Sequence, residues 1–136
     1  MTRATDPDET TPSAADRPTV LLVDDEDEIR HLLALLFEGE DFEVIGEAAD
    51  GANAVAMAVS KRPDFIVLDY MMPGMKGDET ARLLRAIAPD ARIVAFSAVL
   101  TSKPEWADAF LDKARVTEIA PLLGMLAGKV SPAPAP

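Results

Sequence analysis

The stretch Thr19-Val-Leu-Leu-Val-Asp-Asp25 places an unbroken run of β-branched and aliphatic residues directly before two carboxylates. Such a run is typical of a strand buried on both faces, because a strand with one face in water alternates polar and apolar residues. The pattern returns at Phe65-Ile-Val-Leu-Asp69, where an apolar run again ends in an aspartate. The two stretches therefore predict buried strands that each deliver acidic side chains to a strand end.

Between these strands, apolar residues recur at helical spacing. One helical face is formed, at intervals of three and four residues, by Ile29, Leu32, Leu33, Leu36 and Phe37, and Gly39 ends that helix. Asp50 and Asp78 are predicted to cap two further helices, which run to about residue 59 and to just before Pro89. The other predicted elements are strands at 42–48, 93–96 and 109–111 and a last helix at 117–126. This alternation predicts an α/β fold in which helices cover both faces of a parallel sheet.

Composition limits what the 136-residue chain can be. It has 13 Lys and Arg against 24 Asp and Glu, a net charge of −11, and no cysteine. The length fits one domain, disulfides and thiolate metal sites are excluded, and the acidic balance argues against direct binding to nucleic acid. The sequence has neither an apolar run long enough to cross a bilayer nor the apolar core of a signal peptide. We therefore expect a cytoplasmic domain at 18–128, with a disordered tail at 1–17 and a Pro/Ala-rich tail at 129–136.

Chemically active residues follow the predicted strands, where a parallel sheet forms its functional edge. These residues are Asp24, Asp25, Asp69, Ser97 and Lys113. Each alone has an ordinary explanation, as a charge at a helix start, a turn residue, a cap or a surface lysine. Their joint occurrence at strand ends favours a site. Carboxylates that converge repel one another, so we expect a cation among them, and oxygen ligands without His or Cys suit Mg²⁺. A carboxylate beside Mg²⁺ can attack a phosphoryl group, whose oxygens a hydroxyl and an ammonium group would hold.

These residues lie in segments that resemble the receiver domain of two-component response regulators. The segments are Val23-Asp-Asp-Glu26, Leu68-Asp-Tyr-Met-Met-Pro73 with Gly77 beyond it, Phe96-Ser-Ala98, and Ala107-Asp-Ala-Phe-Leu-Asp-Lys113. The resemblance covers residues 18–128. It implies a flavodoxin-like (βα)5 fold, with a doubly wound, five-stranded parallel sheet in the order 2-1-3-4-5.

The resemblance also implies roles for the acidic residues. Asp69 would be the phosphoacceptor, taking a phosphoryl group from a histidine kinase or a phosphotransfer protein. Mg²⁺ would be bound by Asp24, Asp25 and Asp69 together with the backbone carbonyl of Met71. The domain would catalyse only its own Mg²⁺-dependent phosphorylation and dephosphorylation, and is not expected to be an enzyme in any wider sense.

Three further residues take roles from the same resemblance. Ser97 would hydrogen-bond the phosphoryl group, and Lys113 would pair with its charge. Phe110 corresponds to the family's switch aromatic, which is expected to turn inward as the Ser97 hydroxyl moves.

Two features depart from the family pattern. Residues 98–109 are few for a loop, a helix and a second loop, and Pro104 disfavours helix just before it, so a shortened or irregular fourth helix is expected. Lys113 is followed by Ala114, where the family commonly has proline, so the loop after Lys113 is expected to differ.

Output is expected through contact with another protein, by a monomer or a phosphorylation-dependent dimer, because nothing after Leu126 is long enough for an attached effector domain. Neither direct nucleic-acid binding nor membrane binding is expected. One alternative is a degenerate receiver that binds proteins independently of phosphorylation, which the short segment 98–109 favours. The other is a phosphohydrolase of the haloacid dehalogenase type, which would need an acid where Met71 stands.

Overall fold

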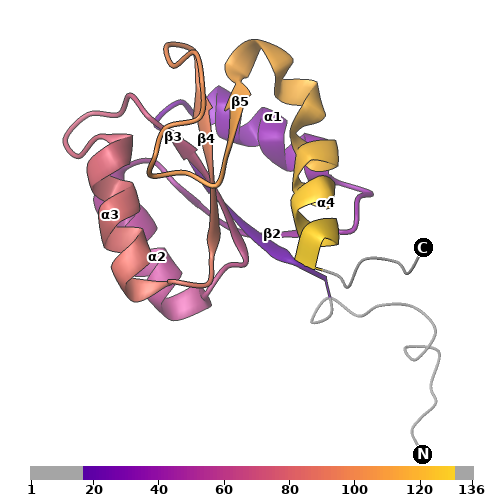
Figure 1. The fold of residues 1–136 in the computed structure, drawn as a ribbon, viewed down its shortest axis with the longest axis horizontal. Coiled ribbons are helices and arrows are strands. Elements are labelled where there is room, and N and C mark those ends of the chain that lie inside the picture. The colour runs from indigo at the N-terminus through magenta and orange to yellow at the C-terminus, as the bar shows by residue number, and fades with distance from the viewer. Residues whose placement is uncertain (1–16, 131–136) are drawn as a thin grey trace, which may run out of the picture.

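The computed structural model describes residues 17–130. Almost all of the predicted tails, at 1–17 and 129–136, lies outside the described residues. Five strands form one parallel sheet in the order β2-β1-β3-β4-β5. Figure 1 shows the strands between the helices of the two sides. The strands are β1 (Thr19–Val23), β2 (Glu43–Ala48), β3 (Phe65–Asp69), β4 (Arg92–Ser97) and β5 (Ala109–Asp112). This order confirms the flavodoxin-like α/β prediction.

Helices cover both faces of the sheet. They are α1 (Asp27–Phe37), α2 (Gly51–Lys61), α3 (Gly77–Ile87) and α4 (Ile119–Val130), with a 3₁₀ helix at Lys113–Glu118. Helices α1 and α4 close one core cluster, and α2 and α3 close a second cluster on the other face, as the two sides of Figure 1 show. Strands β1 and β3 are buried almost throughout, as their unbroken apolar runs predicted.

The helix starts follow the predicted caps in part. The carboxylate of Asp50 accepts a hydrogen bond from the Asn53 backbone N–H at 2.8 Å and begins α2, as predicted. The prediction for Asp78 was wrong, because α3 begins two residues beyond Pro73-Gly74-Met75 at Gly77 with Lys76 as its N-cap. Asp78 lies in the first turn of α3, where the helix dipole favours a carboxylate in any case.

The segment between β4 and β5 contains turns and no helix at residues 98–108. This confirms the expectation of an irregular fourth helix, because the segment is too short for two loops and a helix. The label α4 therefore belongs to the C-terminal helix. The indole of Trp106 stacks on the ring of Tyr70, with ring centroids 6.1 Å apart and planes at 18°. Trp106 and Leu100 pack on the cluster under α2 and α3, and so cover the part of the sheet that a helix would otherwise cover.

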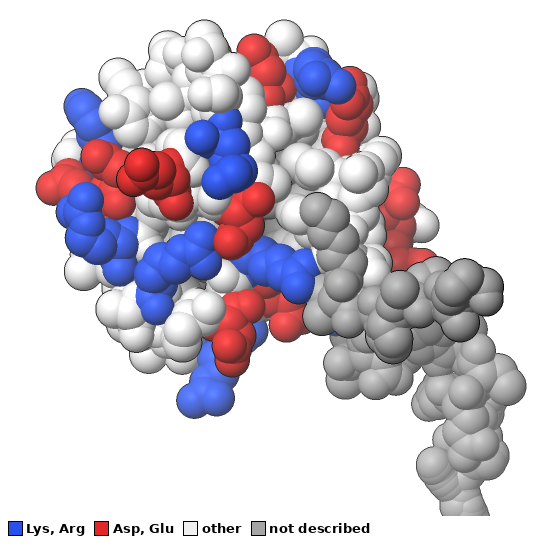
Figure 2. Space-filling model, in the orientation of Figure 1, with Lys and Arg blue, Asp and Glu red and all other residues white. Residues whose placement is uncertain are grey.

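Charge is distributed over the molecule without a single-sign face in the view of Figure 2, where Lys and Arg lie among Asp and Glu. No helix within residues 17–130 combines the length and the apolar character that a bilayer-spanning helix requires.

Candidate functional site

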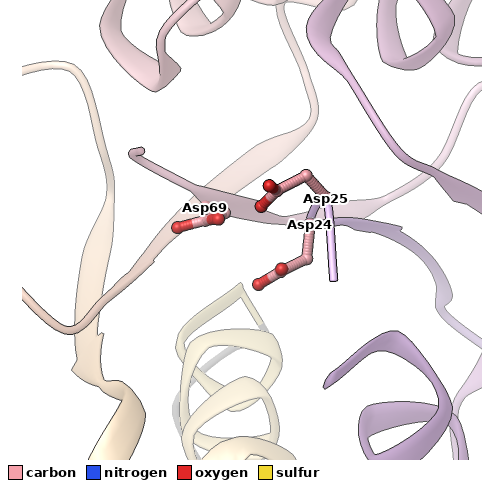
Figure 3. Close-up of side chains that lie close together, drawn as sticks. All are labelled: Asp24, Asp25 and Asp69. Atoms are coloured by element: carbon pink, nitrogen blue, oxygen red, sulfur yellow. The ribbon is translucent and has the colours of Figure 1, made fainter. Parts of the chain in front are cut away.

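Three carboxylates meet at the carboxyl edge of the sheet. Asp24, Asp25 and Asp69 each place an oxygen within 4.8 Å of the others, and Figure 3 shows these oxygens turned toward one common space. Asp24 and Asp69 are buried, whereas Asp25 is exposed. The cluster is therefore a sheltered pocket with one side open to water.

The pairing of β1 with β3 explains why these acids meet. Val23 lies opposite Leu68 in the parallel register, so the residues that follow them, Asp24 and Asp69, reach the same level of the sheet. This register is the reason that residues which follow parallel strands meet at one edge of the sheet.

A glycine allows α3 to start close to the phosphoacceptor position predicted from the sequence. The Gly77 backbone N–H donates to the Tyr70 carbonyl at 2.8 Å. A Cβ at Gly77 would lie 2.8 Å from the Asp69 carbonyl oxygen and 2.7 Å from the Tyr70 Cα, closer than packed atoms tolerate. Only glycine lets the end of β3 and the start of α3 approach in this way.

Lys113 brings the positive charge of the site. Its Nζ lies 2.8 Å from Asp24 Oδ2 and 3.4 Å from Asp69 Oδ1, and it sits 5.5 Å from the centre of the Phe96 ring. The described chain has only trans peptide bonds, so Lys113 reaches both carboxylates without a cis bond to Ala114.

The buried atoms of Asp24 fit a cation. Asp24 Oδ1 accepts the Glu26 backbone N–H at 2.9 Å, whereas Oδ2 is buried and has the Lys113 charge beside it but accepts no well-directed hydrogen bond. Oxygen-only donors from three carboxylates match the preference of Mg²⁺. The residues present therefore fit a magnesium ion.

The electrostatics of the pocket raise two pKa values. Burial and then the charge of Asp24 raise the pKa of Asp69 from 3.8 to about 7, although Lys113 and the backbone N–H of Met71 oppose this shift. Burial disfavours the charged form of Lys113, but its close pairing with the Asp24 carboxylate and the negative charge of Asp69 outweigh that effect and raise its pKa. The Lys113 ammonium therefore stays protonated. The ionised form of Asp69 is disfavoured, because its carboxyl group is buried and lies beside the charge of Asp24.

The remaining predicted residues lie around this pocket. Ser97 is buried at the end of β4, and its Oγ accepts the backbone N–H groups of Val99 and Leu100, each at 3.0 Å. Phe110 on β5 is half-buried and packs on the cluster under α2 and α3. Met71 follows the end of β3 with a half-exposed side chain. The ligand and switch roles of these residues stay predictions.

The sequence analysis missed contacts that join distant positions. Arg30 on α1 donates from Nη1 to the Asp24 carbonyl oxygen at 2.6 Å. Arg85 on α3 donates to Asp108 at 2.9 Å and to the Trp106 carbonyl oxygen at 3.3 Å, which holds the segment before β5. An arginine in the first turn of the predicted helix, five residues after Asp25, is a usable signal for the first contact, because helical side chains lean toward the helix N-terminus. No signal was available for the second.

Comparison with known proteins agrees with this architecture. The family model "Response regulator receiver domain" matches residues 20–114. The nitrate/nitrite response regulator protein NarL of Escherichia coli (strain K12) is 39% identical over 102 residues, which cover 70% of this chain and 47% of NarL. The transcriptional regulatory protein LiaR of Bacillus subtilis is 43% identical over 84 residues, or 61% of this chain and 38% of LiaR. The chain thus spans less than half the length of these two relatives.

Solved structures give the same result. The response regulator domain of Thermotoga maritima CheB aligns with a TM-score of 0.74 at 27% identity, over 87% of this chain and 99% of that one. The response regulator protein TrrA of Thermotoga maritima, solved in complex with Mg²⁺-BeF, aligns with a TM-score of 0.69 at 29% identity, over 81% of this chain and 96% of that one. The chain belongs to the response regulator receiver domain family, the signalling module of two-component systems.

Proposed function

We propose that this receiver domain accepts a phosphoryl group on Asp69 from a histidine kinase or a phosphotransfer protein, and signals by binding another protein. The observation that supports this most strongly is the convergence of Asp69 with Asp24 and Asp25, with the Lys113 ammonium 3.4 Å from Asp69 Oδ1. This arrangement joins a buried nucleophile, a metal-binding donor set and a fixed positive charge in one pocket.

The transfer step is a displacement at phosphorus. A carboxylate oxygen of Asp69 forms the new O–P bond while the bond from phosphorus to the donor breaks, and the electron pair leaves with the donor. From phosphohistidine the pair leaves on an imidazole nitrogen, and from acetyl phosphate it leaves on the acetate oxygen. Bound Mg²⁺ would offset the negative charge of the acids and of the phosphoryl oxygens. Asp24 and Asp25 would hold it with Asp69 and the Met71 carbonyl.

Lys113 and Ser97 supply the remaining contacts. Lys113 lies against Asp69 and Asp24, so its charge is available to the phosphoryl oxygens without a large movement. The Ser97 hydroxyl accepts the backbone N–H groups of Val99 and Leu100 and keeps its own hydrogen free to donate to a phosphoryl oxygen. A movement of Oγ toward the phosphoryl group would release these two N–H groups. With Phe110 nearby on β5, that movement would alter the surface formed by residues 98–108.

The downstream partner is proposed as a protein. Relatives of this domain are named transcriptional regulatory and DNA-binding response regulator proteins, and this chain matches less than half of each. The phosphorylation-independent alternative keeps one point in its favour, the absence of a helix within residues 98–108. The phosphohydrolase alternative requires a second acid at Met71, whose side chain is apolar and half-exposed.

The test is labelling with acetyl phosphate and Mg²⁺. We expect acid-stable, base-labile incorporation that approaches one phosphoryl group per chain and disappears in Asp69→Asn. Asp90→Asn is the matched control, because Asp90 is an exposed aspartate in the turn between α3 and β4, at the opposite end of the sheet. Labelling that persists in Asp69→Asn would overturn the assignment. Absence of label in the folded wild-type protein would leave the binding module, and continued turnover of phosphomonoesters would favour the hydrolase.

A further inference from the structure

Arg30 makes an unusual set of contacts beside the acidic pocket. Its side chain is 13% exposed, and its guanidinium group donates in three directions. Nη1 donates to the Asp24 carbonyl oxygen at 2.6 Å, Nε donates to Glu47 at 3.2 Å, and Nη2 pairs with Asp27. One residue of α1 therefore joins the end of β1, the end of β2 and the start of its own helix.

The bond to Asp24 is the one that bears on the site. The Asp24 carbonyl belongs to the peptide group that connects Asp24 to Asp25. The backbone N–H of Asp24 donates to the Ala48 carbonyl at 3.1 Å, so the bond from Arg30 fixes the backbone of Asp24 on its other side as well. The orientation of that peptide group sets the direction in which the Asp25 side chain leaves the backbone.

Asp25 depends on this support more than its two neighbours do. Asp24 and Asp69 are buried and contact Lys113, whereas Asp25 is exposed and makes no side-chain hydrogen bond or ion pair among the described residues. Its carboxylate reaches the cluster only because the backbone presents it there.

The ion pairs of Arg30 do not explain its burial. The Asp27 and Glu47 side chains are 87% and 42% exposed, and exposed pairs of this kind contribute little stability. They do, however, orient the planar guanidinium group, whose fork can serve three acceptors at once. By orienting the guanidinium group, Asp27 and Glu47 support the hydrogen bond from Arg30 Nη1 to the Asp24 carbonyl oxygen.

We propose that Arg30 is a positioning residue that fixes the Asp24–Asp25 peptide group, and thereby sets the affinity of the acidic pocket for Mg²⁺. The inference rests on the proposed function, because it concerns the same site. It adds a residue that lies outside the cluster and contacts neither the metal ligand atoms nor the phosphoryl group.

The first test is Mg²⁺ affinity measured by titration calorimetry for Arg30→Gln and Arg30→Lys. We expect the dissociation constant to rise about tenfold in Arg30→Gln, the scale seen when a group that supports a metal ligand is lost. Arg30→Lys should lie between Arg30→Gln and wild type, because its compact ammonium group lacks the planar fork that reaches three separated acceptors. Labelling at saturating Mg²⁺ should reach the same stoichiometry in all of these proteins.

Arg85→Gln is the matched control. Arg85 is also a partly exposed helical arginine that bonds one carboxylate and one backbone carbonyl, but it does so beside β5. It should lose comparable stability and keep the wild-type affinity for Mg²⁺. Equal affinity in Arg30→Gln, Arg85→Gln and wild type would overturn the proposal.

A second measurement needs no metal. The Glu26 backbone N–H donates to Asp24 Oδ1 and reports on the same turn. In metal-free protein, amide hydrogen exchange at Glu26 should accelerate several-fold in Arg30→Gln and stay unchanged in Arg85→Gln. An unchanged Glu26 rate would count against Arg30 even if wild type bound no Mg²⁺, whereas failure of wild type to bind Mg²⁺ or accept label would count against the proposed function.

Discussion

The surroundings of the Asp69 carboxyl group disfavour its ionised form. Burial and the neighbouring Asp24 raise its pKa to about 7, and the Lys113 ammonium limits the shift. A nucleophilic carboxylate must be ionised, so the same surroundings that shelter the nucleophile also suppress it near neutral pH. A cation in the pocket would relieve this conflict.

This pKa predicts how the stability of the metal-free protein depends on pH. The folded state keeps a proton on Asp69 up to about pH 7, whereas the unfolded chain releases it near pH 4. Folding therefore takes up a proton in this window, and the free energy of unfolding falls as pH rises through it. Asp69→Asn removes that loss.

We expect Asp69→Asn to be more stable than wild type at pH 8 and to lose most of this advantage at pH 5. The difference should be on the order of 1–2 kcal/mol, less than the full shift implies, because water enters the pocket beside exposed Asp25. Urea unfolding in EDTA at several pH values measures it, with Asp90→Asn expected to follow the wild-type curve. A constant difference between Asp69→Asn and wild type would contradict the prediction.

At the scale of elements, the segment between β4 and β5 joins two parallel strands without a helix. Residues 98–108 contain no helix, but several contacts hold the segment in place. Ser97 Oγ accepts two N–H groups at the start of the segment, and Trp106 stacks on Tyr70 near its end. Asp108 closes it, because its Oδ2 accepts both the Ile93 backbone N–H at 2.8 Å and Arg85 Nη2.

Asp108 should therefore matter for stability out of proportion to its exposure. Asp108→Ala leaves the N–H of buried Ile93 without its acceptor, and an unsatisfied buried donor costs about 1–3 kcal/mol. Asp108→Asn keeps an acceptor oxygen and should cost less. Chemical denaturation tests this, with Glu105→Ala as the control, because Glu105 is exposed in the same segment. Equal losses in Asp108→Ala and Glu105→Ala would refute the role of Asp108.

The contrast between strand ends and this segment shows what the sequence could predict. The sequence predicts that Asp24 and Asp69 lie together, because an apolar run fixes where each strand ends and parallel pairing carries the ends to one edge. The path of residues 98–108 follows no comparable pattern in the sequence and could not be predicted from it. It depends on pairs such as Tyr70 with Trp106 and Arg85 with Asp108, which are distant in sequence and follow no period.

The reach of Lys113 was the other feature that the sequence left open. The expected difference after Lys113 concerned the backbone, whereas the position of the ammonium is set by its attraction to two buried carboxylates. Because charge attraction holds the Lys113 ammonium against Asp24 and Asp69, Lys113 can reach them with Ala114, and not proline, as the next residue.

At the scale of the whole molecule, the net charge of −11 has two distinct parts. Most acidic side chains among the described residues are exposed or partly exposed, and Figure 2 shows acidic and basic groups mixed on one face. Asp24 and Asp69 are different, because they are buried, place carboxylate oxygens within 4.8 Å of each other and share one Lys113. Salt screens the exposed charges, but buried charges are screened much less.

This difference predicts a specific effect of Mg²⁺ on the stability of the entire domain. An ion that binds only the folded state stabilises it by about 2.7 kcal/mol at 100 times its dissociation constant, which for a domain of this size raises Tm by roughly 10 °C. NaCl at matched ionic strength should shift Tm far less, because it acts on the exposed charges alone. Asp25→Asn is the most informative variant, because Asp25 belongs to the carboxylate cluster but is exposed and contributes little to folding. We expect it to lose most of the Mg²⁺ effect and to keep a metal-free Tm close to that of wild type. Thermal scans across a Mg²⁺ series decide the matter: an equal rise of Tm with NaCl, or an undiminished rise in Asp25→Asn, would place the stabilisation on the general acidic surface and remove the metal from the pocket.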